Sequence, residues 1–183
     1  MSPTLFLGVK YSQRLDTCVL ASYAVACFPF TNKQPVLDYF LSYCRHFKLN
    51  ETHPERSYDL HFHPLSKIKP GYQIIKELHD SSSESVFVKA RQSITLSPLI
   101  NWSKDVAAVN ASIRKDNCLL LLFINESSLP GLSSGHSIVV GHNSSHGLYY
   151  FDTARPCNEI LQAGPNQIAD FGTLGDAYLV TKI

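Results

Sequence analysis

Residues 133–152, "SSGHSIVVGHNSSHGLYYFD", carry the pattern of one β-hairpin and set the interpretation of the whole chain. Two runs rich in β-branched and aromatic residues, 137–140 and 148–151, flank a polar segment that ends at Gly147. Such runs around a short glycine-containing turn are typical of paired antiparallel strands. The stretch therefore predicts an antiparallel hairpin late in the chain.

The outer ends of this hairpin carry an imidazole and a carboxylate, His136 and Asp152. If the pairing is centred near Ser144, His136 lies opposite Asp152 and Val140 lies opposite Leu148. Directly opposed residues have Cβ atoms about 4.5–5.5 Å apart, which suits an imidazole N–H donating to a carboxylate. A slip of one residue would put the two side chains on opposite faces of the sheet. The alternative is that both are ordinary residues at strand boundaries.

The chain has 183 residues, a length that suits one domain over residues 1–183 with a substantial buried core. Its formal net charge is +1, which gives no electrostatic footprint for nucleic acid or for an anionic membrane. No apolar run approaches the ~18–20 residues of a membrane span, and the first residues lack the pattern of a signal peptide. We expect a monomer without a nucleic-acid partner or membrane span. It is expected to be cytoplasmic, or delivered into a host cell without a cleavable signal peptide.

The other segments divide into an earlier helical part and a later strand part. Apolar residues at helical spacing predict four helices, over about 18–27, 31–47, 70–78 and 102–114. The second of these helices would be capped by Thr31 or Asn32, with Pro35 in its first turn. The polar stretch 50–64 predicts a loop. β-branched and apolar runs predict strands or extended segments over 5–10, 85–90, 117–124 and 177–182. This order indicates an α+β fold in which the first helix packs on the sheet and begins near the outer end of the hairpin.

The cysteines favour free thiols, because there is an odd number of them and no signal peptide. Those within apolar patterns are expected to be small buried hydrophobic residues: Cys27, Cys44 and Cys118. Cys157 lies outside these patterns. Cys18 differs because it lies in the first turn of an apolar helix, directly after Asp16 and Thr17, either of which could cap the helix. The partial positive charge of a helix N-terminus stabilises a thiolate there.

Four residues of the chain together suggest nucleophilic catalysis. Cys18 is the candidate nucleophile, and His136 is the candidate base that activates it. Asp152 is the candidate group that holds the imidazole in the required tautomer. The side-chain amide of Gln13, with the backbone N–H of Cys18, is a candidate donor to a developing oxyanion. Taken by itself, Cys18 could equally be a buried structural thiol.

Three short motifs carry a resemblance to a known family: "Q-x4-C" at the start of a helix, "GHSIVVG" late in the chain, and "YYFDTARP" one strand later. With them the chain resembles the papain-like cysteine hydrolases, in particular the YopT-type effector proteases and the peptidase C39-like proteins. The resemblance implies a helical part packed on an antiparallel sheet with the active-site cleft between them. It also implies that Cys18 is the nucleophile, His136 the general base and acid, Asp152 its orienting partner, and Gln13 part of the oxyanion hole.

The chain departs from the family pattern at two places. Val19 follows the cysteine where many relatives carry glycine or tryptophan, and Thr153-Ala154 follow the aspartate where relatives often carry proline and asparagine. These departures leave the proposed triad intact and leave the subfamily and the substrate open.

Three classes of function follow from these observations. The first is a cysteine protease that cuts a protein or peptide substrate through an acyl-enzyme. The second is a protein glutamine deamidase or transglutaminase-like effector that uses the same triad. The third is a non-catalytic protein-binding module with the same fold. By analogy with small proteins of this family, the chain would suit a bacterial effector or toxin.

Two histidine pairs raise the question of a metal site: His61 with His63, and His142 with His146. Neither pair has a cysteine or carboxylate spaced to complete the four ligands that zinc requires. We therefore expect no metal and no cofactor.

Overall fold

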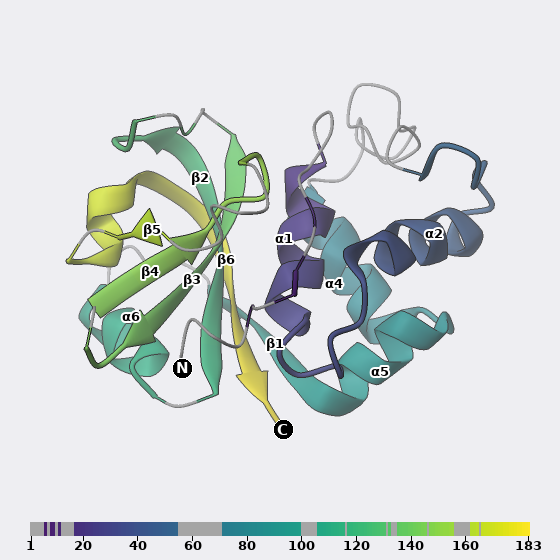
Figure 1. Cartoon of the computed structure of the whole chain (residues 1–183), viewed down its shortest axis with the longest axis horizontal. Helices are drawn as coiled ribbons and strands as arrows, with labels where there is room; N and C mark the ends of the chain where they lie inside the picture. Colours follow the sequence, from purple (N-terminus) through teal and green to yellow (C-terminus); the bar gives the residue numbers. More distant parts are fainter. Residues whose placement is uncertain are drawn as a thin grey trace.

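The structure is a computed structural model that describes residues 6, 8–9, 11, 17–54, 71–99, 106–115, 117–130, 132, 135–145, 147–155, 162–164 and 166–183. Its helices and strands separate into two halves (Figure 1), with the sheet on the left and most of the helices on the right. The predicted α+β class is therefore confirmed. In this part of the chain no helix is both long and apolar enough to cross a membrane.

The described strands form one antiparallel sheet in the order β1-β6-β2-β3-β4-β5. Their bounds are β1 Ile94–Leu99, β2 Cys118–Ser127, β3 His136–Asn143, β4 Gly147–Phe151, β5 Gln162–Ala163 and β6 Gly172–Lys182. β2 lies inside the sheet, between β6 and β3, and its apolar run 118–122 is buried. A strand that is covered on both faces needs such a continuous apolar run, so the predicted central strand is confirmed.

Helices cover both faces of the sheet. On one face α1 (Cys18–Cys27) lies between the sheet and the helices α2 (Val36–His46), α4 (Gly71–Ser81) and α5 (Ser85–Ser93), as Figure 1 shows. On the other face α6 (Val106–Ile113) and the 3₁₀ helix η4 (Ile168–Phe171) enclose a second apolar cluster.

All ten residues of α1 are buried, because the sheet covers one side of this helix and other helices cover the rest. A helix that is apolar all round is stable only in such a setting. The predicted helix 18–27 is confirmed with these bounds, and the chain turns at 28–33 around Pro29.

The register of the hairpin differs from the prediction. Val140 pairs with Tyr150 and not with Leu148, so the centre of the pairing lies one residue later than Ser144. This moves each partner by two residues. Because side chains alternate with a period of two, an even shift leaves every side chain on its predicted face.

The turn explains this register. Asn143 pairs with Gly147 across the turn, and the side-chain oxygen of Asn143 accepts the backbone N–H of Ser145 at 2.8 Å. Gly147 has a φ of +74°, the left-handed conformation that glycine adopts without strain. The pair Asn143–Gly147 thus encloses a loop of three residues, one residue longer than a two-residue hairpin turn.

The predicted strand over 85–90 is wrong, because these residues belong to helix α5. Its buried side chains are Val86, Phe87 and Ala90, which share one face at helical spacing. Packing of this face against the other helices outweighs the β propensity of the short run "SVFV". The strand in this region comes next, as β1, and pairs with the C-terminal strand β6.

Other expectations need smaller corrections. α2 begins at Val36 with Pro35 in the N-cap position, so neither Thr31 nor Asn32 caps it. Within the predicted extended segment 5–10, the N–H of Val9 donates to the carbonyl of Phe6 at 3.0 Å, which forms a turn. Most of the predicted loop 50–64 and the beginning of the predicted helix 102–114 lie outside the described residues.

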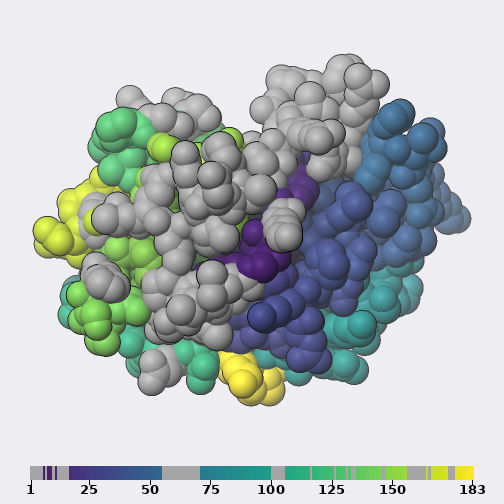
Figure 2. Space-filling model, viewed as in Figure 1, coloured from purple at the N-terminus to yellow at the C-terminus, as the bar shows by residue number. Residues whose placement is uncertain are grey.

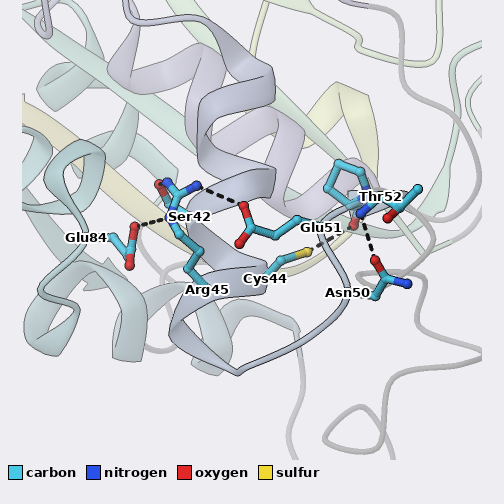
Figure 3. A network of polar contacts seen from close by, with 8 residues as sticks. Ser42, Cys44, Arg45, Asn50, Glu51, Thr52 and Glu84 are labelled. Atoms are coloured by element: carbon cyan, nitrogen blue, oxygen red, sulfur yellow. Dashed lines mark hydrogen bonds and ion pairs between the residues drawn. The ribbon is translucent and has the colours of Figure 1, made fainter.

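The outer side of the helical half carries a polar network (Figure 3). Arg45 on α2 donates to Glu84 at 2.7 Å, just before α5, and to Glu51 at 3.1 Å. These exposed ion pairs contribute little stability. Beside them Cys44 donates to the carbonyl of Pro54 with its sulfur 3.8 Å away, and its side chain is fully buried. Cys44 is therefore a buried structural thiol, as predicted.

Candidate active site

Cys18 is the first residue of helix α1, the position that the sequence predicted. Its side chain is buried, and the N-terminal end of α1 points the helix dipole at it. Thr17 occupies the N-cap position but makes no capping hydrogen bond with its side chain. Asp16, the other candidate cap, lies outside the described residues.

His136 and Asp152 meet at the end of the hairpin, as predicted. His136 is the first residue of β3, and Asp152 directly follows β4. The ladder between the two strands ends at the pair Val139–Phe151, so both residues lie beyond the last pair. They are diagonal neighbours and not directly opposed. The long imidazole side chain spans this offset, and His136 Nε2 lies 2.6 Å from Asp152 Oδ1.

The turn after β4 fixes the carboxylate of Asp152. Its Oδ1 also accepts the backbone N–H of Ala154 at 2.9 Å, and its Oδ2 lies 3.5 Å from Nε of Arg155. Burial alone would raise the pKa of Asp152, but His136, the Ala154 N–H and the Arg155 charge together lower it. Asp152 is therefore an ionised carboxylate at neutral pH.

The Cys18 side chain also lies beside the His136 ring, where its hydrogen bonding and its charge raise the pKa of the imidazole. Because Asp152 engages Nε2, Nδ1 is the ring nitrogen left for this contact. Burial alone would lower the pKa of His136. The hydrogen bonds to Asp152 and Cys18 and the negative charges of both groups outweigh burial and raise this pKa to about 9. At neutral pH the imidazole is thus protonated, and the Cys18 sulfur lies beside it.

The three side chains form one line of contacts from thiol to imidazole to carboxylate. Cys18, His136 and Asp152 are 5%, 6% and 5% exposed. They come from the start of a helix, the start of a strand and the turn after the next strand. Figure 2 shows purple atoms from the N-terminal part of the chain at the boundary between the sheet half and the helical half. The low exposure of the three groups strengthens their electrostatic interactions, since little water screens them.

Gln13, the candidate oxyanion donor, falls outside the described residues. The role of Gln13 therefore stays a prediction. The backbone N–H of Cys18 is a candidate donor in its own right, because the first N–H groups of an α-helix have no partner within the helix.

The histidine pairs considered for a metal site are largely outside the described residues: His61, His63 and His146. Among the residues that are described, no group of three or more His, Cys, Asp or Glu side chains is arranged to hold a metal ion. His142 lies on β3, where burial and the charge of Arg114 lower its pKa.

Sequence reasoning missed the groups that hold the Asp152 carboxylate. An Asp at the start of a turn often accepts the N–H two residues later, so the contact with Ala154 could have been expected from "DTAR". The contact with Arg155 follows from the same turn, in which the N–H of Arg155 donates to the carbonyl of Asp152 at 3.2 Å. The guanidinium also donates to the carbonyl of Pro130 at 3.0 Å, a contact that no local pattern predicts.

No family model, curated protein or solved structure matches this chain.

Proposed function

We propose that this protein is a papain-like cysteine hydrolase that cleaves an amide bond of a protein or peptide through a Cys18 acyl-enzyme. One observation carries the proposal. A thiol at a helix N-terminus lies beside a buried imidazole that is hydrogen-bonded to a buried carboxylate, although the thiol comes from a distant part of the sequence. Each group has the partner that its role in such a reaction requires.

In the first step the Cys18 thiolate attacks the carbonyl carbon of the scissile amide and forms a carbon–sulfur bond. The negative charge that develops on the carbonyl oxygen is stabilised by backbone N–H groups at the start of α1, with Gln13 as the second candidate donor. The carbon–nitrogen bond then breaks. The leaving amine takes the proton from His136, and the thioester remains on Cys18.

In the second step water replaces the leaving amine. The now neutral His136 takes a proton from this water, whose oxygen attacks the thioester carbon. The carbon–sulfur bond breaks, the carboxylic acid product leaves, and Cys18 returns as a thiolate beside protonated His136. Asp152 keeps the imidazole oriented in both steps without being protonated itself.

A purely structural role for the His136–Asp152 pair is supported less well. A buried ion pair contributes little net stability, because removing both charges from water costs about as much as their attraction returns. A structural pair would also have no need of a thiol as a third member. The third member, and its place at a helix N-terminus, favour catalysis over the binding-module hypothesis.

The proposal is tested by incubating the protein with a peptide mixture prepared from a whole-cell lysate and comparing peptide masses before and after. Two matched variants are compared. Cys18→Ala removes the buried thiol of the proposed site, and Cys118→Ala removes a buried thiol outside it. New peptide termini that depend on Cys18 and not on Cys118 would support a protease. Glutamine converted to glutamate, or crosslinked peptides, with the same dependence would support the deamidase or transferase alternative. Identical peptide maps for the wild type and Cys18→Ala, under conditions in which Cys18 reacts with iodoacetamide, would contradict the proposed hydrolysis.

A further inference from the structure

A buried hydrogen bond joins the helix that carries Cys18 to the strand that carries His136. The hydroxyl of Ser22 on α1 donates to the backbone carbonyl of Ser137 on β3 at 2.9 Å. Both serines are fully buried. Ser137 is the residue next to His136, and Ser22 lies one helical turn after Cys18. Residues four apart share one face of a helix, so this bond and the Cys18 side chain face the same way.

The sheet explains why the bond forms at this place. The ladder between β3 and β4 ends at Val139–Phe151, because the chain leaves the sheet at Asp152. Ser137 therefore lies beyond the last pair of that ladder, although it still pairs with Phe123 of β2, and α1 packs against β3. The carbonyl of Ser137 accepts a hydrogen bond from the helix through Ser22.

We propose that Ser22 is a positioning residue that sets the separation and orientation of the Cys18 sulfur and the His136 ring. The proposal rests on the proposed function, since it concerns the same thiol–imidazole pair. The neighbouring residues on this side of α1 have apolar side chains, whose packing contacts are not directional: Ala21, Val25 and Ala26. A hydrogen bond to a strand carbonyl is directional, so it opposes sliding and rotation of the helix on the sheet in a way that apolar contacts do not.

The chain offers a matched control at the other end of the same helix. The hydroxyl of Thr31 donates to the carbonyl of Cys27 at 3.0 Å and is also buried. Thr31→Val removes a buried hydroxyl that donates to a backbone carbonyl at the end of α1 opposite to the Cys18–His136 pair. A second comparison is Ser137→Ala, since the hydroxyl of Ser137 is buried and makes no hydrogen bond to any described residue. Ser137→Ala should therefore change Cys18 less than Ser22→Ala does.

The test is the rate of Cys18 alkylation by iodoacetamide as a function of pH, with peptide mapping to identify the labelled cysteine. In the wild type a thiolate paired with imidazolium should react well below the ordinary thiol pKa of about 8.5. In Ser22→Ala we expect the rate at pH 6 to fall by about 10-fold or more, because small displacements weaken aligned pairs strongly. The rate should recover at alkaline pH, where every accessible thiol ionises. Thr31→Val should lose stability and keep the wild-type profile.

Ser22→Thr keeps the donor and should keep the wild-type profile. If Ser22→Ala does not fold, Ser22→Cys, which has a similar volume and a weak donor, takes its place, with labelling assigned separately to positions 18 and 22. If Ser22→Ala, or Ser22→Cys in its place, folds and keeps the wild-type profile of rate against pH, the proposed role of Ser22 is wrong. This result would leave the proposed function standing. An ordinary thiol profile for Cys18 in the wild type would instead contradict the Cys18–His136 pair and with it the proposed function.

Discussion

The two ends of helix α1 each place a cysteine in a cluster with a buried histidine, and the two clusters have opposite protonation. At the N-terminal end, Cys18 contacts His136. At the C-terminal end, Cys27 lies beside Tyr23, and the hydroxyl of Tyr23 lies 2.8 Å from Nδ1 of His79. The two histidines are equally buried, at 6% and 4% exposed. The pKa of His136 is nevertheless raised to about 9, whereas burial lowers the pKa of His79 to about 4.

The partner of each histidine accounts for this difference. Burial disfavours the charged form of both imidazoles. At His136 the hydrogen bonds and charges of Asp152 and Cys18 outweigh burial. At His79 the charge of Asp80 raises the pKa, but burial together with the positive charges of Lys76 and Arg91 outweighs it. His79 faces the neutral phenol of Tyr23, whose own pKa burial raises well above its ordinary value. The same burial raises the pKa of Cys27 to about 12. One end of α1 therefore lies beside a protonated imidazole, and the other end carries a thiol whose pKa burial raises near a neutral imidazole.

Replacing either histidine by alanine should have the largest effect and the clearest contrast. His136→Ala should lower turnover by at least about 10⁴-fold, as expected when the base of a triad is lost. His79→Ala should destabilise the fold and leave turnover of the folded fraction close to that of the wild type. The measurement is turnover with a peptide substrate identified from the lysate-derived mixture, normalised to folded protein. An equal loss in both variants would contradict the functional difference between the two ends.

Asp152→Asn should lower turnover by about 10²–10⁴-fold, because the amide cannot stabilise the imidazolium and favours the wrong tautomer. The fold should survive, since the amide keeps the size of the carboxylate. The pKa of His136, followed by NMR of the ring protons, should fall toward or below its ordinary value in this variant. A matched control is Asp38→Asn on α2, which also removes a carboxylate in a hydrogen bond, to Gln34. An unchanged His136 pKa in Asp152→Asn would exclude the carboxylate as the cause of the shift.

The two thiols of α1 should differ in alkylation rate by more than about 100-fold at pH 7, because reactivity follows the thiolate fraction and exposure. Cys18 should react first with iodoacetamide in the folded protein. Cys27 and Cys118, whose pKa values burial raises, should react only after unfolding. Peptide mapping at short reaction times assigns the label. Labelling of Cys27 or Cys118 ahead of Cys18 would remove the basis for naming Cys18 the nucleophile.

The smallest expected effect is on stability, where the two histidines should act in opposite pH ranges. His79 has a folded pKa near 4, below the ordinary 6.5, so stability should be lost as the pH falls from about 6.5 to 4. His136 has a folded pKa near 9, above 6.5, so the stability it contributes should be lost as the pH rises from about 6.5 to 9. Each contribution is on the order of 3 kcal/mol or less.

Urea unfolding of the wild type, His79→Gln and His136→Gln across pH 4–9 measures these contributions. The stability curve of His79→Gln should be flatter on the acid side only, and that of His136→Gln on the alkaline side only. Curves that change on the same side in both variants would mean that the two protonation states have been assigned wrongly.

Much of the fold follows from local pattern. The helix 18–27 was predicted with its observed bounds because an apolar run ends directly before Pro29. The buried strand and the hairpin were predicted from composition and turn residues. The His136–Asp152 contact was predicted although the register was wrong by two residues, since an even shift preserves the side of the sheet.

The errors arose where local pattern is ambiguous. The residues of the run "SVFV" have high β propensity, but the apolar residues of this segment are also spaced as on one face of a helix. Only packing against the neighbouring helices decides between strand and helix. The insertion of the C-terminal strand β6 between β1 and β2 also has no local signal, because strand order depends on contacts between distant segments.

The sequence by itself determined which groups are present for chemistry: a thiol at a helix start, and an imidazole and a carboxylate at the ends of one hairpin. Only the tertiary structure decided their state. His136 and His79 are both buried, yet one is protonated and the other neutral at pH 7. Protonation depends on the charge that lies within hydrogen-bond distance after folding. The partner of His79 is 56 residues away in sequence, whereas the partner of His136 lies 16 residues away, at the other end of the same hairpin.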